Sequence, residues 1–222
     1  MELWLPYGST EIPVRVPDDN FYRILEPNKP GPKDTVALIE NALENPVGDK
    51  RLKDMVKSGI TAGIVVDPIT PVGVRADAIK VLSSHLSALG VEKTRVFVRK
   101  RLSNIVVPQE ETRVLDPSQN SFTEIGKTGA GTTVDLDPEV LACEVKISVG
   151  LSMPHFASAL SGGPDSVIPA SSSNRSIAKN RALVTKGLTM PLSVTDNPVL
   201  LDSLEAYKLA GPFYSVCFLP DG

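Results

Sequence analysis

The sequence lacks the features that would place it among secreted or membrane proteins. Its two cysteines, Cys143 and Cys217, lie in apolar runs and are too few for a disulfide framework, so both are expected to pack as small hydrophobic residues. No apolar stretch approaches the ~20 residues that span a bilayer, and no basic segment precedes a hydrophobic one at the start, so no signal peptide is expected. These absences predict a cytoplasmic protein.

An excess of charge of either sign is also missing. The chain has 23 Lys and Arg against 26 Asp and Glu, a net charge of −3, which is not the basic excess that binds nucleic acid non-specifically. With 41% hydrophobic residues it can build a core, and its 19 prolines predict sharply bounded elements. We therefore expect a globular protein whose partners include neither nucleic acid nor a membrane.

The hydrophobic pattern predicts an α/β fold. Residues 60–66 form an almost continuous apolar strand of the kind buried on both faces of a parallel sheet, and a helix over 74–89 and a strand over 94–98 complete a βαβ unit. Further strands are predicted at 145–150 and 213–219. Since βαβ units favour parallel strands with right-handed connections, we expect a Rossmann-like, mostly parallel sheet with helices on both faces.

The rest of the chain is predicted to form short elements around this sheet. Two short strands are expected at 2–5 and 11–16, and a small β-hairpin at 122–125 and 132–136. Helices are expected over 34–43, 50–57, 171–184 and 197–211, with Asp34 and Asn197 as caps. Residues 17–33, and those from the end of strand 94–98 to Asn120, are predicted to be irregular.

Several familiar motifs are incomplete. Gly126-Lys127-Thr128 resembles the end of a phosphate-binding loop, but Ser121 stands where a Walker loop needs glycine, and a predicted strand follows in place of a helix. Gly129-Ala130-Gly131 fails the dinucleotide fingerprint for the same reason, so both are assigned to a hairpin turn. The two histidines, His85 and His155, are 70 positions apart and predict no metal cluster. No Gly-x-Ser-x-Gly elbow is present.

Three positions lie where an open α/β sheet binds its ligands, beyond the carboxyl ends of its strands. Asp67 ends strand 60–66, His155 follows strand 145–150, and Arg99-Lys100-Arg101 closes strand 94–98. For Asp67 and the basic run there is also an ordinary structural explanation, as a turn aspartate and as a solvated strand end. Composition alone favours that explanation.

Three segments resemble one known family. The first comprises Leu5-Pro6-Tyr7-Gly8, Leu25-Glu26-Pro27 and Ala42–Gly48, and the second is Val66-Asp67-Pro68-Ile69-Thr70-Pro71. The third and most specific comprises Pro154-His155-Phe156, Ser161-Gly162-Gly163, Val167-Ile168-Pro169 and Asn180-Arg181-Ala182-Leu183. They resemble the lactate racemase family, whose corresponding motifs read Asp-His-Thr-Arg-Pro, then Pro-His-Phe-Phe-Ala-Gly-Phe-Ser-Gly-Gly-Ala-Lys, and finally Asn-His-Ala-Leu.

The resemblance implies one domain over residues 1–222, equivalent to the family's N-terminal domain; the family's C-terminal domain has no counterpart in this sequence. It also implies an isomerase activity, in which a hydride moves between a 2-hydroxy acid and a nickel-pincer cofactor tethered to a lysine. In the family, two histidines act as acid and base and an arginine binds the carboxylate. By this resemblance His155 matches one acid/base histidine and Asp67 the aspartate of the turn, and these are the candidate catalytic residues.

Four other positions depart from the family's pattern. Thr70 replaces the arginine of the turn, Asp165 replaces the tethering lysine, Arg181 replaces the nickel-binding histidine, and no histidine stands near Arg101, where the second acid/base histidine is expected. A carboxylate cannot form the family's amine-derived linkage, and a guanidinium has no lone pair for a metal. We therefore expect no cofactor and no metal, and a loss of nickel-pincer chemistry.

The replacements make the rim of the sheet more cationic, through Arg181, Arg101 and Arg175, and helix amides at 171–174 would add to this. We expect a non-catalytic or regulatory protein that binds a small organic acid or phosphate-bearing anion. Its ligand-binding residues are predicted to be Thr70, Arg101, Ser161, Gly162, Gly163, Asp165 and Arg181. The alternative is a 2-hydroxy acid racemase or epimerase completed by a partner domain or subunit. The partner could also be a second copy of this chain, in a homo-oligomer.

Overall fold

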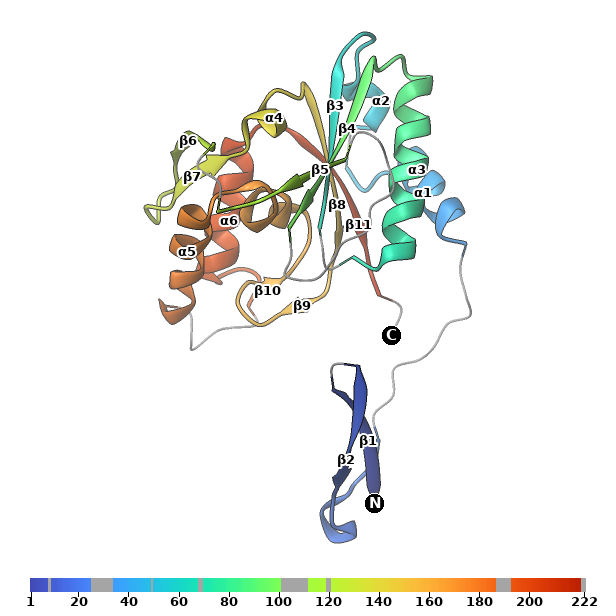
Figure 1. Ribbon diagram of the computed structural model, residues 1–222, viewed down its shortest axis with the longest axis vertical. Helices are drawn as coiled ribbons and strands as arrows, with labels where there is room; N and C mark the ends of the chain where they lie inside the picture. Colours follow the sequence, from blue (N-terminus) through green and yellow to red (C-terminus); the bar gives the residue numbers. More distant parts are fainter. Residues whose placement is uncertain are drawn as a thin grey trace. The chain divides into compact units, whose positions relative to one another are not determined.

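The computed structural model describes residues 1–7, 9–24, 34–48, 50–67, 70–100, 112–118, 121–186 and 193–220. The chain divides into two compact units, Met1–Gly31 with Asp221–Gly222, and Pro32–Pro220. Figure 1 shows the elements of both. Within the described ranges, no helix is both long and apolar enough to cross a bilayer.

The smaller unit is built on an antiparallel hairpin of β1 (Glu2–Tyr7) and β2 (Thr10–Arg15). The two short strands predicted here are therefore confirmed. The side chains alternate between faces, so Leu3 pairs with Val14 on one face, and Glu2 pairs with Arg15 on the other through an ion pair of 2.8 Å.

The larger unit contains a five-stranded sheet in the order β11-β8-β3-β4-β5. Its strands are β3 (Thr61–Val66), β4 (Lys93–Arg99), β5 (Thr112–Leu115), β8 (Val145–Leu151) and β11 (Phe213–Phe218). Every neighbouring pair is parallel, which confirms the predicted α/β fold.

One strand of the sheet contradicts the sequence prediction. β5 lies within the stretch predicted to be irregular. It pairs with β4 at the edge of the sheet, and only Leu115 of its four residues is buried. A short edge strand with one solvent-facing side carries little hydrophobic signal, which is why the pattern missed it.

Helices cover both faces of the sheet (Figure 1). On one face lie α1 (Thr35–Glu44), α2 (Leu52–Met55) and α3 (Val72–Ala88); on the other lie α4 (Pro138–Leu141), α5 (Asn174–Arg181) and α6 (Pro198–Leu209). Asp34 caps α1 as predicted, since its side chain accepts the N–H groups of Val36 and Ala37. The helix predicted over 50–57 is only the single turn α2, and the short α4 was not predicted.

The core has one layer on each side of the sheet. Ile64 and Val66 point towards α1 and α3, whereas Val65 and Phe97 point to the opposite face, where they pack with Cys143. A Cβ added to Gly63 would lie only 2.8 Å from the Cys143 sulfur, so the glycine makes room for the cysteine. Cys143 is buried, and burial raises its pKa to about 11, as expected of a packing residue.

The segment around Gly126 and Gly129 is a hairpin turn, as predicted. It joins β6 (Thr123–Lys127) to the antiparallel β7 (Thr133–Leu136). The turn is bound to α6, because the Thr128 hydroxyl donates to Asp202, and the Gly129 N–H donates to Glu205 at 2.6 Å. Its backbone donors therefore serve the fold and do not form a phosphate-binding loop.

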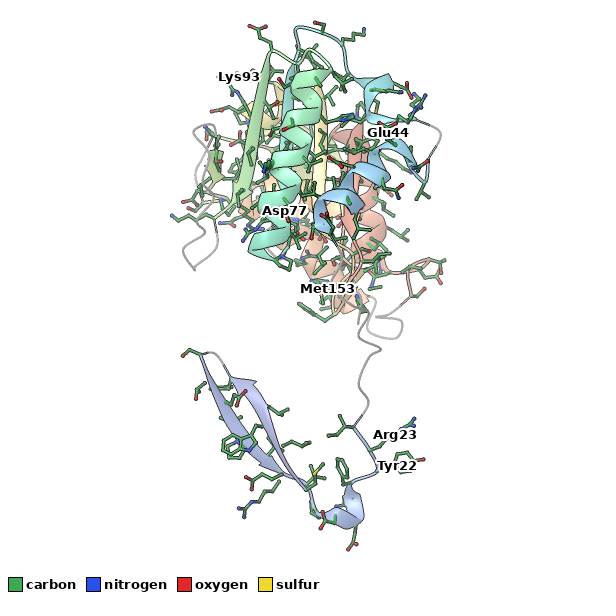
Figure 2. All side chains as sticks on the ribbon, turned by 90° about the vertical axis from the view of Figure 1, so that its right-hand side faces the viewer. Tyr22, Arg23, Glu44, Asp77, Lys93 and Met153 are labelled. Carbon is green, nitrogen blue, oxygen red and sulfur yellow. The ribbon has the colours of Figure 1, made fainter. Side chains whose placement is uncertain are left out.

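The connections of the sheet create a switch point between β3 and β8. From β3 the chain crosses by α3 to β4 on one side, and from β8 it returns by α6 to β11 on the other. Ligands of open α/β sheets bind at the carboxyl ends of the strands beside such a point. Figure 2 shows Lys93, where β4 begins, at one end of the sheet, and Met153, which follows β8, at the other.

Candidate functional site

Asp67 lies at the carboxyl end of β3, beside the end of β8. Its N–H donates to the carbonyl of Val149 at 2.8 Å, which continues the pairing of the two strands. A Cβ added to Gly150 would lie 3.8 Å from Cβ of Asp67 and 3.7 Å from Cα of Gly162. The Asp67 turn and the Gly162 turn therefore both come close to Gly150 at the switch point.

His155 lies on a small hairpin that follows β8. The hairpin consists of β9 (Pro154–His155) and β10 (Ala159–Leu160), and Ser161 closes its base by donating to the carbonyl of Leu151 at 2.7 Å. The Nδ1 atom of His155 accepts the N–H groups of Ala157 and Ser158 at 3.3 and 3.1 Å. Burial and the charge of Arg181 both lower the pKa of His155, so the imidazole is neutral near pH 7.

Asp165 lies in a 3₁₀ turn, Gly163–Ser166, directly after the Gly162 turn. One carboxylate oxygen accepts the Gly162 N–H at 3.0 Å, and the other lies 4.0 Å from the guanidinium of Arg181 at the end of α5. The pKa of Asp165 is raised to about 6. Burial is the main cause and the carboxylate of Asp67 adds to it, whereas the Gly162 N–H and Arg181 act in the opposite direction.

These interactions bring four of the predicted site residues together. Arg181 acts on the pKa values of both His155 and Asp165, and Asp67 acts on that of Asp165. The cluster is thus one cation, one neutral imidazole and two carboxylates, of which Asp165 titrates near neutral pH. Charges that influence one another in a partly dry site are the usual mark of a functional centre.

The other predicted ligand-binding residues have different surroundings. Thr70 is fully buried, its N–H donates to the Asp67 carbonyl at 3.1 Å, and its hydroxyl has no hydrogen-bond partner within the described ranges. The Ser161 hydroxyl accepts the Met153 N–H and donates to the Leu151 carbonyl, so both of its roles are used within the hairpin. Gly162 has a φ of 133°, which favours glycine. Arg101 lies outside the described residues, so its predicted role stays a prediction.

The expected contribution of the α5 N-terminus and of Arg175 to the cationic rim is wrong. The Arg175 guanidinium donates to Asp135 at 2.6 Å and to Glu124 at 3.1 Å, which binds it to the β6–β7 hairpin. The Ser173 hydroxyl caps α5 by accepting the Ser176 N–H. Arg181 is the last residue of α5. Of the two proposed rim arginines within the described residues, Arg181 lies at the site and Arg175 does not.

Strand β11 also contributes to the site, which was not predicted from the sequence. Cys217, near the carboxyl end of this strand, accepts the Gly163 N–H, and a Cβ added to Gly162 would lie 3.6 Å from its sulfur. Ser215 accepts a hydrogen bond from Ser148 at 2.8 Å and lies 2.7 Å from the Tyr207 hydroxyl. Cys217 lies within the predicted strand 213–219, where its apolar neighbours favoured a packed position; that expectation is wrong, because its side chain is exposed.

Comparisons with known proteins show which family the chain resembles. Residues 7–189 match the lactate racemase N-terminal domain family. The lactate racemase of Thermoanaerobacterium thermosaccharolyticum is 25% identical over 93% of this chain and 53% of its own length. That of Lactiplantibacillus plantarum is 25% identical over 80% of this chain and 46% of its own. The chain thus spans about half the length of the curated relatives it matches.

Solved structures show the same fold. The lactate racemase apoprotein from T. thermosaccharolyticum superposes with a TM-score of 0.75 at 19% identity, over 100% of this chain and 56% of that one. A crystal structure of a protein from Thermotoga maritima gives a TM-score of 0.61 at 16% identity, over 78% of this chain and 47% of that one.

Proposed function

The chain belongs to the lactate racemase N-terminal domain family, and from that membership we propose that it binds a small organic acid or phosphate-bearing anion beside Arg181, without the nickel-pincer chemistry of the family. His155 and Asp67, which match the family's pattern, would border the ligand. In this proposal the protein is a binding or regulatory member of the family.

The residues at the site do not fit the nickel-pincer group. At the position of the tethering lysine, Asp165 offers a buried carboxylate, which already accepts the Gly162 N–H. At the position of the nickel-binding histidine, Arg181 offers a guanidinium, which stays protonated and has no lone pair. Within the described residues, no three His, Cys, Asp or Glu side chains are grouped to hold a metal ion. The donor set supports a site that binds an anion by hydrogen bonds.

One observation carries the proposal. The Nη1 atom of Arg181 is buried and has no hydrogen-bond partner within the described part of the chain, and the only ion pair of this guanidinium there, to Asp165, is long at 4.0 Å. A buried donor without a partner is unfavourable, and a carboxylate or phosphate oxygen would satisfy it. Asp165 and Asp67 oppose the binding of an anion, but protonation of Asp165 reduces that opposition.

Ligand titration of a charge variant tests the proposal. L-lactate and inorganic phosphate are titrated calorimetrically into the protein and into Arg181→Met, with Lys179→Met as the control, since Lys179 is exposed on the same helix. We expect saturable millimolar binding by the protein and the control, and at least a tenfold loss in Arg181→Met. No binding by the protein, or equal binding by Arg181→Met, would overturn the proposal.

The alternative is a 2-hydroxy acid racemase or epimerase that a partner domain or subunit completes. It is favoured by the chain's coverage of about half the length of its relatives and by the match of His155 and Asp67 to the family motifs. Its test is metal analysis with intact mass, after co-expression with the enzymes that make the pincer cofactor. Stoichiometric nickel, or an added cofactor mass, would replace the first proposal by this one.

A further inference from the structure

The hydrogen bonds around His155 determine which of its ring nitrogens carries the proton. Nδ1 accepts two backbone N–H groups, from Ala157 and Ser158, and lies 2.9 Å from the Ser158 hydroxyl. A backbone N–H can only donate, so Nδ1 must present its lone pair to them. The neutral imidazole therefore carries its proton on Nε2.

Ser158 follows His155 by three positions, in the segment that joins β9 to β10. Its side chain is buried, and its hydroxyl lies 2.9 Å from His155 Nδ1 and donates to the carbonyl of Leu160 at 3.1 Å, so the two acceptors share its single proton. The hydroxyl thus connects the ring of His155 to the second strand of its own hairpin.

We propose that Ser158 is a positioning residue that holds His155 in the Nε2–H tautomer, so that the site offers its ligand a hydrogen-bond donor at Nε2. The ligand must then present an acceptor oxygen to His155, as a carboxylate or a phosphate does; this part rests on the function proposed above. In this tautomer Nε2 cannot take a proton from a hydroxyl of the ligand. Nε2 could accept a proton only if the ring hydrogen moved to Nδ1. That hydrogen would then point at the N–H groups of Ala157 and Ser158, which are donors themselves, so this tautomer is unfavourable.

The surroundings of the ring favour the same state. Arg181 on α5 is the charged group that acts on His155, and its positive charge opposes a second proton on the ring. The Asp165 carboxylate, on the 3₁₀ turn, lies 4.0 Å from the guanidinium of Arg181 and compensates part of that charge. Phe156 covers one side of the imidazole, with ring centroids 4.7 Å apart, and contributes no charge.

Nitrogen NMR of the histidines tests the tautomer directly. The chain has only two histidines, so protein labelled with ¹⁵N-histidine gives two sets of ring signals, and His85 on α3 is an internal control. We expect the Nδ1 signal of His155 at the position of an unprotonated nitrogen and its Nε2 signal at that of a protonated one. A hydrogen on Nδ1 of His155 in the unmodified protein would overturn the proposal, whatever any variant does.

Variants then test the role of Ser158. Ser158→Ala removes a donor that favours the neutral ring, so the pKa of His155 should rise by about half to one unit, while that of His85 stays fixed. Ser158→Thr keeps the hydroxyl and should restore the original titration; Ser84→Ala, an exposed serine beside His85, should move neither. Unchanged titration of His155 in folded Ser158→Ala would overturn the role of Ser158. If that variant does not fold, Ser158→Cys, which replaces the hydroxyl by a much weaker donor, decides in its place: unchanged titration of His155 would then overturn the role of Ser158.

Added phosphate separates this inference from the proposed function. The tautomer is measured without ligand, so a protein that binds no anion can still show the Nε2–H state. If phosphate binds by calorimetry, the Nε2 signal of His155 should shift on saturation. Binding without such a shift would overturn the ligand contact of His155 and leave the proposed anion site intact.

Discussion

The carboxylate of Asp165 lies 4.0 Å from the guanidinium of Arg181, yet its pKa is raised to about 6. A nearby cation normally lowers the pKa of a carboxyl group. Here the loss of hydration in a nearly closed site outweighs both the long ion pair and the single N–H of Gly162. Folding therefore shifts this side chain towards its protonated form, which predominates only below about pH 6.

Replacing Asp165 by asparagine should stabilise the protein at neutral pH. A carboxyl group whose pKa is raised on folding contributes stability below its unfolded pKa, near 3.8, and loses it as the pH rises through about 6. Asparagine does not ionise and can still accept the Gly162 N–H. At pH 7.5 we expect Asp165→Asn to be more stable by about 1–3 kcal/mol, a difference that disappears near pH 4.

Urea denaturation at several pH values measures this difference. Asp19→Asn is the control, since Asp19 is exposed in the smaller unit. A constant difference between Asp165→Asn and the unmodified protein from pH 4 to 8 would show that Asp165 does not titrate as expected.

Anion binding should weaken as the pH rises. An anion beside Arg181 would raise the pKa of Asp165 above 6, so binding takes up a proton and is favoured below that pH. We expect the affinity for L-lactate to fall by about tenfold between pH 5.5 and 8 for each unit by which the ligand raises this pKa. Calorimetry in buffers of different ionisation enthalpy measures how many protons the protein takes up on binding. Asp165→Asn should abolish the pH dependence of the affinity.

Replacing Ala159 by glycine should stabilise the His155 hairpin. Ala159 has a φ of 61°, a left-handed conformation that is unfavourable with a Cβ. We expect Ala159→Gly to add up to about 1 kcal/mol to the free energy of unfolding. Ala157→Gly, in the same hairpin without a positive φ, should instead destabilise the protein. Loss of stability in both variants would contradict the strain assigned to Ala159.

The contact between Gly63 and Cys143 should behave as a coupled pair. Gly63→Ala places a Cβ 2.8 Å from the cysteine sulfur, and overpacking of this kind costs about 1–3 kcal/mol. Cys143→Ala removes the sulfur and should accept the new methyl group. In a double-mutant cycle by urea denaturation, we expect the double variant to be less destabilised than the sum of the single variants. Simple additivity would mean that the two residues do not share this space.

Much of the sheet could be predicted because its central strands carry a strong apolar signal. Residues 61–66 are an almost continuous hydrophobic run, which the centre of a parallel sheet can bury on both faces, and residues 145–151 place an apolar side chain at every second position, beside the polar Lys146 and Ser148. Helix α1 could be placed by its aspartate cap. The edge strand β5 and the one-turn helix α4 could not be placed, because four residues with a single buried side chain, Leu115 in β5 and Val140 in α4, leave no hydrophobic periodicity to recognise.

The site could be predicted only where it follows the strands. Asp67 and His155 were located by their positions after two predicted strands, and the order of those strands in the sheet then brought them to the switch point. The surroundings of Arg175 could not be foreseen, because its partner Asp135 comes from a strand 40 positions earlier. Nor does the sequence show that His155 Nδ1 is bound by its own hairpin, since that depends on the turn geometry after Phe156.

The pairing of β3 with β8 has a consequence for synthesis of the chain. About 80 residues separate the two strands in sequence, although they are neighbours at the centre of the sheet. At 5–20 residues per second, β8 emerges from the ribosome roughly 4–16 s after β3. During that interval β3 can pair with β4, but its other edge stays open to nascent chains and chaperones. The seam that carries Asp67 and His155 is therefore absent from the early nascent chain, and any truncation before β8 leaves a hydrophobic edge where the site would have formed.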